Sequence, residues 1–420
     1  MARPSILSDE LLRQLVPVGQ VDIMVGLPTH NHAATIGPIV TALHAGLAKH
    51  FPRERTVLVN PDAGSDDGTR EILMNAPLAP DELRGIPALR TTHRVSAGNA
   101  PQHGHTGGVR AVFAAADLLQ AKVVVLVDPD VIDLHEDWVE QVARPVLTRQ
   151  ADLLLPCHPR RRFDGALLSQ LVRPLLGAAF ARQLPSHVSG EFGCSGQFAA
   201  QRVTDPLWEQ EPSRASMDIW LLSTALALDL RITEANVGPR KFAERRDSPG
   251  LSALFGEIVG TTFGCLDRFA ANWLSRTPEV RLLPGGPAWP LMDDQNPVDP
   301  VPMAERFRSG VRDLAPLLHE LLTPGTHAAL RETASAAEPT PRLSDSLWAT
   351  IVYEFAAAVH RHLMNREHAI QALVPIYLGR AASHFAEIAS SDEAEHQGRL
   401  NSLESEFARL RPVLLNRWNA

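Results

Sequence analysis

Two carboxylates stand one residue apart at the end of an apolar run. The segment VVVLVDPDVIDLHEDW (residues 123–138) turns acidic at Asp128 and Asp130, with Pro129 between them. Side chains two apart along an extended strand share a face. Carboxylates suit Mg²⁺ or Mn²⁺, and Mg²⁺ commonly takes one or two of them plus substrate phosphates. The D-x-D pair is therefore either a metal and diphosphate site at the end of a buried strand or a solvated turn.

A second polar segment, PDAGSDDGT (residues 61–69), follows the apolar run RTVLVN. Asp62 could accept a hydrogen bond from a base N–H or a ribose hydroxyl. Gly64 and Gly68 permit positive φ and close approach of the backbone to a ligand. The alternative is an ordinary Asp/Gly turn.

Strands and helices alternate between residues 21 and 133, which predicts a mostly parallel sheet. We expect strands in VDIMVGLP, RTVLVN and KVVVLV, and helices in residues 33–51, 69–75 and 109–119. Ligands of such sheets bind at the carboxyl ends of the strands. Those ends carry LPTHNH (residues 27–32), PDAGSDDG and DPDVID. Three polar strand ends in one sheet favour a ligand site over three unrelated turns.

Further along the chain, Glu191 lies between glycines in SGEFG, and Asp218 in SMDIWLL precedes an apolar helical run. Either carboxylate could face a sugar. The alternatives are a surface turn for Glu191 and a helix-dipole contact for Asp218. Arg160, Arg161 and Arg162 follow a fourth strand. They could bind an anionic group, because guanidinium matches carboxylate and phosphate geometry, or they could form a solvated edge.

Composition bounds the class of protein. The chain has 420 residues, a formal net charge of −8 and three scattered cysteines. The acidic balance gives no indication of nucleic-acid binding, and the cysteines have neither zinc-site spacing nor the even number of a disulfide framework. The first 20 residues lack an apolar signal core, and no apolar stretch has membrane-spanning length. We expect a soluble, cytoplasmic protein without a membrane partner.

The chain divides into four predicted parts. Residues 1–20 form a helical extension, residues 21–277 the α/β domain, and residues 278–302 a connection rich in proline and glycine. Residues 303–420 are expected to form an all-helical C-terminal domain.

With these motifs in order, the chain resembles nucleotide-sugar glycosyltransferases of the GT-A fold, a Rossmann-like sheet flanked by helices. It is most similar to their retaining branch, which contains glucosyl-phosphoglycerate, glucosylglycerate and mannosylglycerate synthases. The segments that carry the resemblance are GLPTHNHAATIG, DAGSDDGT, VDPDVID, ARPVL, RRFDG, VSGEFG, MDIW, NVGPRKF and the helical tail.

The resemblance implies a hexosyl transfer from UDP-glucose, GDP-mannose or ADP-glucose to a small hydroxy acid such as glycerate, with Mg²⁺ or Mn²⁺ as cofactor. Asp130 would be the main metal ligand, with Asp128 beside it and near the ribose. Glu191 and Asp218 would be the catalytic carboxylates that hold sugar or acceptor hydroxyls. The residues expected to contact the donor nucleotide are Leu27, Pro28, Thr29, Asn31, Asp62, Gly64, His105 and Asp128. Arg160, Arg161 and Arg162 would bind the acceptor. Relatives of this kind also imply a homodimer or larger homo-oligomer, with the helical tail as an interface.

Two positions depart from the family pattern. His105 stands nearest a family lysine, and Phe242 stands where the family has a histidine that ligates the metal. Phenylalanine cannot ligate, so the resemblance implies a metal held by Asp130, water and diphosphate, with His103 or His105 as compensating imidazoles. Weak metal dependence, a changed donor and loss of activity stay open.

Two other functions are compatible with these motifs. One is a sugar-phosphate nucleotidyltransferase, although that class typically has a lysine-containing glycine-rich loop after its first strand, which LPTHNHAATIG lacks. The other is a catalytically degenerate protein that binds a nucleotide sugar without transferring it.

Overall fold

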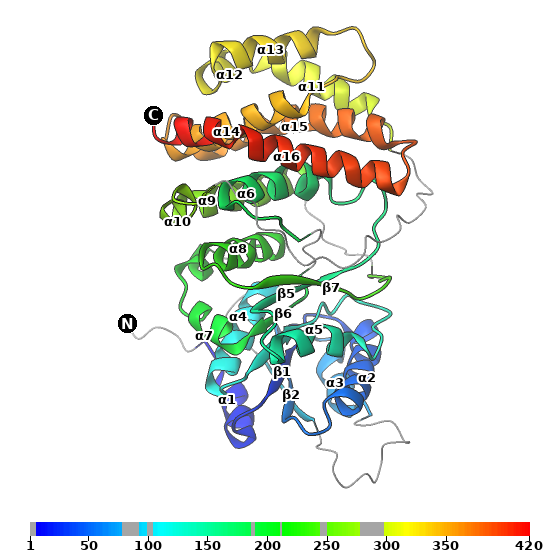
Figure 1. The fold of residues 1–420 in the computed structure, drawn as a ribbon. Helices are drawn as coiled ribbons and strands as arrows, with labels where there is room; N and C mark the ends of the chain where they lie inside the picture. Colours follow the sequence, from blue (N-terminus) through cyan, green and yellow to red (C-terminus); the bar gives the residue numbers. More distant parts are fainter. Residues whose placement is uncertain are drawn as a thin grey trace.

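An α/β region built on one sheet is followed along the chain by layers of helices (Figure 1). The computed structural model describes residues 6–77, 92–98, 104–185, 190–210, 212–243, 250–277 and 298–420. Its sheet has seven strands in the order β3-β2-β1-β4-β6-β5-β7. Their bounds are β1 Ile23–Gly26, β2 Thr56–Asp62, β3 His93–Gly98, β4 Val123–Leu126, β5 Leu153–Cys157, β6 Phe192–Ser195 and β7 Ile232–Asn236.

Six strands of this sheet run parallel, and β6 runs antiparallel to its neighbours β4 and β5. Strand β1 lies between β2 and β4, with Ile23 paired to Thr56 on one side and to Val123 on the other. Every residue of β1, β2 and β4 is buried. Strands covered on both faces read as continuous apolar runs, which is why β1, β2 and β4 could be predicted from the sequence. The expected mostly parallel α/β fold is confirmed.

Helices cover both faces of the sheet because alternate strand residues point to opposite sides. Ile23, Val25 and Val125 pack in one apolar core, whereas Met24 and Val124 belong to the other. The first core is closed by α2 (Ala33–His50), α3 (Thr69–Asn75) and α5 (Trp138–Leu147). The second is closed by α1 (Asp9–Leu15), α4 (Gly104–Leu118), α7 (Gly196–Arg202) and α8 (Arg214–Ala227).

The C-terminal helices continue the second core without a break. That core runs from Leu7 to Trp418 and includes residues of α6 and α9, on which α14, α15 and α16 pack. The bounds are α6 Arg173–Phe180, α9 Leu251–Arg268, α10 Ala270–Leu274, α11 Val301–Asp313, α12 Ala315–Leu321, α13 Pro324–Ser335, α14 Asp345–His360, α15 Arg366–Ile388 and α16 Glu393–Trp418. The expected C-terminal helices are therefore present and share their apolar core with the α/β region. Most of the expected connection, residues 278–297, lies outside the described residues.

Buried polar contacts tie the two regions together. Trp348 Nε1 donates to the carbonyl of Gln170 at 2.6 Å, and Arg173 pairs with Glu404 at 2.8 Å across the α6–α16 contact. A cavity of about 470 Å³ beside this pair is lined by both residues. None of the residues that the sequence proposes for the site lines that cavity.

Three local features differ from the expected elements. A π-helical turn, Leu168–Val172, directly precedes α6. Strands β3 and β6 lie in segments for which the sequence predicted no strand.

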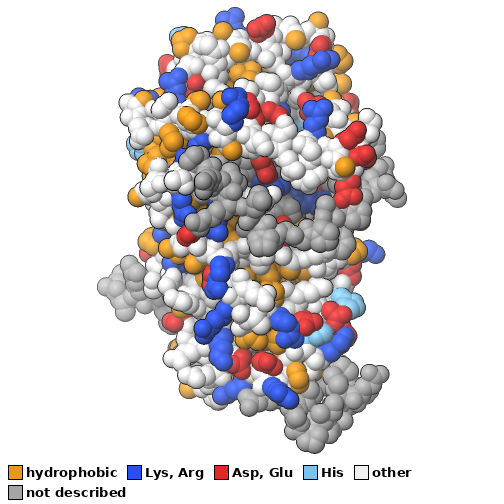
Figure 2. All heavy atoms as spheres, viewed as in Figure 1, with side chains coloured by type: hydrophobic (Ala, Val, Ile, Leu, Met, Phe, Trp, Pro, Cys, Tyr) orange, Lys and Arg blue, Asp and Glu red, His pale blue; other side chains and the backbone are white. Residues whose placement is uncertain are grey.

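Among the described residues, no helix has both the length and the apolar character needed to cross a bilayer. Acidic and basic side chains are intermixed along the face seen in Figure 2.

Candidate functional site

Three strand ends bring the candidate residues together. Asp62 is the last residue of β2, the LPTHNH segment follows β1, and the D-x-D pair follows β4. Because β1 pairs with both β2 and β4, these three carboxyl ends adjoin in the sheet. A bridge between Thr29 and Asp62 joins two of the segments directly. The sheet therefore places the predicted donor-binding segments at one edge, where ligands of parallel sheets bind.

Asp62 organises the loop that follows it. Its Oδ2 accepts from Thr29 Oγ1 at 2.7 Å and Ser65 Oγ at 2.6 Å, and its Oδ1 accepts from the backbone N–H of Gly64 at 3.0 Å and Ser65 at 2.7 Å. A carboxylate has about four acceptor positions, so the loop uses all of them. Gly64 adopts φ +89°, which only glycine adopts without strain. The contact of Asp62 with a base remains a prediction, and a direct one would require that one of these bonds open.

Asn31 links the β1 loop to the β2 loop. Its backbone N–H donates to Ser65 Oγ at 2.8 Å, and its side-chain oxygen accepts from the Asp66 N–H at 3.1 Å. Leu27 is buried, and Pro28 packs so closely on Gly108 that a Cβ there would lie 2.6 Å from the proline Cβ. These residues thus stiffen the edge, and their contact with a donor remains a prediction.

The D-x-D turn is held from two sides. Thr35 on α2 donates to the carbonyl of Pro129 at 2.6 Å, and the N–H of Ala243 donates to the carbonyl of Asp130 at 2.8 Å. Asp128 is fully buried, and its Oδ1 accepts from the Asp130 N–H at 2.9 Å. The turn is therefore part of the packed structure and differs from the solvated turn that the sequence left open.

Asp130 is the more accessible acid of the pair, with a side-chain exposure of 19%. His32 Nε2 lies 3.1 Å from its Oδ1, and the His30 backbone N–H donates to His32 Nδ1 at 3.0 Å. Because Nδ1 accepts, Nε2 carries the hydrogen and donates to the carboxylate. His32 thus orients Asp130, a role that the sequence did not assign to it.

Glu191 lies next to Asp128 and is buried. Both of its carboxylate oxygens lie 3.4 Å from Arg240 Nη2, and its Oε1 accepts from the Asp128 N–H at 3.4 Å. The pKa of Glu191 is raised to about 7, mainly by burial; the charge of Arg240 opposes this rise, and the charge of Asp128 adds to it. A carboxyl group with this pKa can hold or release a proton near neutral pH.

Arg214, the first residue of α8, is the feature that sequence reasoning missed. Its Nη2 forms a close ion pair with Asp128 Oδ2, and its Nη1 lies 3.6 Å from Asp130 Oδ2. Burial opposes its charge, yet the carboxylates of Asp128, Asp218 and Asp130 raise its pKa. Asp218 is itself buried, one helical turn after Arg214. One signal was available: a cation at a helix N-terminus opposes the helix dipole, so its position there needs another explanation.

The charge of this cluster fits one divalent cation. Asp128, Asp130 and Asp218 exceed Arg214 and Arg240 by one negative charge, and Glu191, whose pKa is about 7, brings the excess to two when it is ionised. Among the described residues, no three His, Cys, Asp or Glu side chains are grouped as metal ligands. Asp130 would therefore hold Mg²⁺ or Mn²⁺ together with water and diphosphate oxygens, as Mg²⁺ sites commonly do.

Phe242 lies beside the turn, where it forms a backbone bridge with Val131. Its ring centre is 5.8 Å from that of His158. The pKa of His158 is lowered to about 4, mainly by burial and in addition by the charges of Arg160 and Arg240. A neutral imidazole thus lies next to the ring of Phe242. The side chain of His105, and all of His103, lie outside the described residues.

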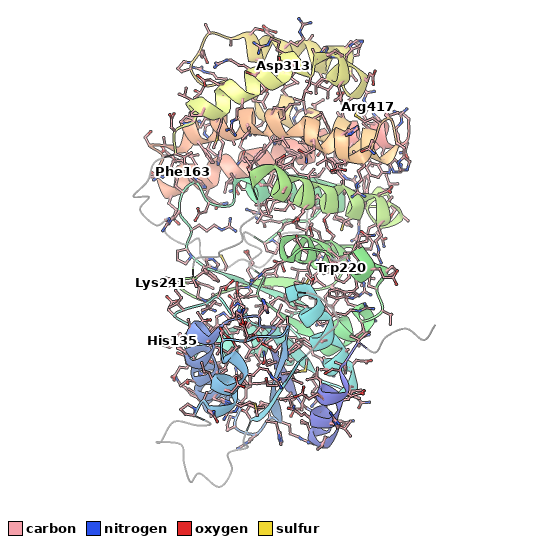
Figure 3. All side chains as sticks on the ribbon, turned by 180° about the vertical axis from the view of Figure 1, so that it is seen from behind. His135, Phe163, Trp220, Lys241, Asp313 and Arg417 are labelled. Atoms are coloured by element: carbon pink, nitrogen blue, oxygen red, sulfur yellow. The ribbon has the colours of Figure 1, made fainter. Side chains whose placement is uncertain are left out.

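The three consecutive arginines do not act as one patch. Arg162 Nη1 donates to the carbonyls of Ile388 at 2.7 Å and of Ser391, so it binds the end of α15, and the next residue, Phe163, packs on Phe385. Figure 3 shows Phe163 beside the helical layers, whereas Lys241 lies near the sheet. Arg161 is exposed. Arg160 lies within electrostatic range of His158, Arg173 and Glu234, and its contact with an acceptor remains a prediction.

The chain is similar to several solved structures of known proteins. No protein-family model matches the chain, and no curated protein matches it. Among solved structures, it is similar to glucosyl-3-phosphoglycerate synthase from Mycobacterium tuberculosis in complex with Mn²⁺, UDP-glucose and phosphoglyceric acid, with 22% identity, a TM-score of 0.42, and 64% of this chain and 86% of that chain covered. The same enzyme with Mg²⁺ and UDP gives 20% identity and a TM-score of 0.42, with coverages of 64% and 86%. The sheet and the C-terminal helices of this chain are those of an α/β protein with a helical C-terminal region.

Proposed function

We propose that the protein is a retaining glycosyltransferase that moves a hexose from a nucleotide sugar to a small hydroxy acid. The observation that carries this proposal is the position of Asp130. It is the accessible member of an otherwise buried acidic cluster, it lies at the carboxyl end of β4, and it adjoins the Asp62 loop. A diphosphate ester at such an edge needs charge neutralisation, which a metal ion on Asp130 would supply, and a rigid frame, which the hydrogen-bonded Asp62 loop would supply.

In this proposal each residue acts on the donor or on the acceptor. Bound Mg²⁺ or Mn²⁺ supplies positive charge to the leaving diphosphate. Asp130, oriented by His32, would hold that ion, while the Asp62 loop and residues 27–31 frame the nucleotide. Asp218 and Glu191 would hold hydroxyl groups of the sugar or the acceptor. The leaving phosphate would take the acceptor proton on the same face of the sugar. Because no protein base is then needed, the protein would raise the rate mainly by positioning the donor and the acceptor.

The acceptor class follows from Arg160 and from the length of the loop after β5. The phosphoglycerate enzymes that the chain resembles have a glycine-rich loop with an arginine ahead of the corresponding helix, whereas only residues 158–165 separate β5 from the helical residues 166–172 here. Arg160 would therefore pair with the carboxylate of an unphosphorylated acid such as glycerate. Its planar guanidinium suits a carboxylate.

The test is a matrix of donors and acceptors. UDP-glucose, GDP-mannose and ADP-glucose are each incubated with glycerate or 3-phosphoglycerate and with Mg²⁺ or Mn²⁺. Acceptor-dependent release of a nucleoside diphosphate is expected for at least one pair, and its absence from every pair contradicts the proposal. Pyrophosphate release from a nucleoside triphosphate would indicate a nucleotidyltransferase instead.

A second candidate is a nucleotide-sugar-binding protein without turnover. Phe242, which stands where the family that the chain resembles has a metal-ligating histidine, favours this candidate. The ion pairs of Arg214 with Asp128 and Asp130 favour it too, because they occupy carboxylates that would hold the metal. Tight donor binding with no transfer to any acceptor would support this function over the first.

A further inference from the structure

We propose that Arg214 is a built-in cation that competes with the divalent metal for Asp128 and Asp130, and that the donor diphosphate is its alternative partner. This inference rests on the proposed function for the identity of the diphosphate. In the donor-free protein the guanidinium holds the carboxylate oxygens. When metal and donor bind, it exchanges those oxygens for phosphate oxygens.

The geometry gives Arg214 the position that a metal would need. Its two terminal nitrogens face Oδ2 of Asp128 and Oδ2 of Asp130, one on each acid. The other oxygen of Asp128 accepts a backbone N–H, and the other oxygen of Asp130 accepts from His32. A cation that bridges the pair would therefore have to approach the oxygens that face Arg214.

The backbone around Arg214 is shaped to admit its side chain. Gly190 adopts φ +75°, and a Cβ at that position would lie 2.4 Å from Arg214 Nε. Glycine thus leaves the space through which the guanidinium reaches the acids. At the start of α8 the dipole disfavours a cation, so the acids are what hold it there.

Competition follows from the charges. The two acids cannot give the same oxygens to a guanidinium and to a metal at once. Guanidinium also forms two parallel hydrogen bonds with phosphate oxygens. A bound diphosphate therefore offers Arg214 negatively charged oxygens in place of the carboxylate oxygens. A protein with this arrangement binds free metal weakly and binds a nucleoside diphosphate even without metal.

The first test measures Mn²⁺ binding to the full-length, donor-free protein by the loss of the free Mn²⁺ electron paramagnetic resonance signal. Arg214→Gln should bind Mn²⁺ more tightly than the unmodified protein, by about tenfold, which is within the usual range of coupling between two sites. Arg214→Lys should fall between them, because a compact ammonium replaces the planar fork whose two terminal nitrogens face one acid each. Arg231→Gln is the matched control, since it removes an arginine–carboxylate pair with Asp152 that is exposed and outside the cluster.

The second test measures UDP binding in the presence of a chelator by calorimetry. The unmodified protein should bind UDP, and Arg214→Gln should bind it more weakly. Equal Mn²⁺ affinities in the unmodified protein and in both Arg214 variants, with native circular dichroism, would overturn the proposal. So would unchanged chelator-resistant UDP binding. If Arg214→Gln does not fold, Arg214→Lys decides both tests. The Mn²⁺ measurement needs neither sugar nor acceptor, so it can succeed even if no glycosyl transfer is found.

Discussion

Arg240 Nη2 lies 3.4 Å from both carboxylate oxygens of Glu191, and the guanidinium carbon stands 5.1 Å from the centre of the Trp138 ring. The arginine is thus held between an acid and an aromatic face in a region closed to water. A buried carboxylate normally becomes neutral unless it is well paired. Burial outweighs this long pair, which is why the pKa of Glu191 is raised to about 7.

The raised pKa predicts a pH dependence of stability. The folded protein holds a proton on Glu191 that the unfolded chain releases above its ordinary pKa of 4.5. The free energy of unfolding should therefore fall as pH rises from about 4.5 to about 7, by roughly 3 kcal/mol at about 1.4 kcal/mol per pKa unit, and then level off. Glu191→Gln removes this component. Urea unfolding of both proteins at pH 5, 6 and 8 should show the variant gaining relative stability as pH rises. A difference that is constant with pH would contradict the raised pKa.

Substitution of the two D-x-D acids should separate stability from binding. Asp128→Asn leaves Arg214 without its closest buried partner and should cost roughly 3 kcal/mol of unfolding free energy. Asp130→Asn affects an accessible side chain and should cost less than about 1 kcal/mol. The Asp130 variant should nevertheless lose metal-dependent binding of the donor. Chemical denaturation and donor titration with Mn²⁺ check both effects, and unchanged donor affinity in Asp130→Asn would refute its assignment.

The support of the turn from α2 can be tested with two threonines. Thr35→Val removes the bond to the buried carbonyl of Pro129 and should cost about 1–3 kcal/mol, because the acceptor is left without that partner. Thr41→Val, on the exposed side of the same helix, loses only a bond to the carbonyl of Gly37 and should change stability by less than about 0.5 kcal/mol. Donor affinity should fall in the first variant alone. Equal effects of the two changes would mean that Thr35 does not hold the D-x-D turn.

Phe242→His tests whether this position belongs to the metal site. Phe242 bridges Val131, one residue after Asp130, so an imidazole there would lie near the acids. We expect tighter Mn²⁺ binding and a stronger metal dependence of donor binding. Identical Mn²⁺ titrations of the variant and the unmodified protein would place the side chain outside the site.

The parts of the molecule that could be predicted are those that local pattern determines. Strands β1 and β4 are continuous apolar runs because helices cover both of their faces, so each could be recognised by itself. Strand β6, with the sequence FGCS, has no such signature and exists because β4 and β5 pair with it from both sides. The predicted ends of the strands were enough to place Asp62, Asp128 and Asp130 at one edge of the sheet, and no side-chain contact had to be known.

Long-range ion pairs were not predictable in this way. Arg214 is 84 positions from Asp130 in the sequence, and nothing in PSRASMDIW states which acids it meets. The different surroundings of the arginines at residues 160–162 were not predictable either. Consecutive residues suggest one patch, although Arg162 binds the end of α15 and Arg161 is exposed.

Those three arginines allow a last prediction in which neighbours in sequence give different results. Arg162→Gln should lower the free energy of unfolding by roughly 1–3 kcal/mol, because the guanidinium binds carbonyls at the end of α15. Arg161→Gln should change neither stability nor activity, since this side chain is exposed. Arg160→Gln should raise the KM for the hydroxy-acid acceptor while the affinity for the donor stays the same. If Arg160→Gln and Arg161→Gln have equal acceptor KM values, Arg160 does not bind the acceptor carboxylate, and the acceptor site must be sought among other residues at this edge of the sheet.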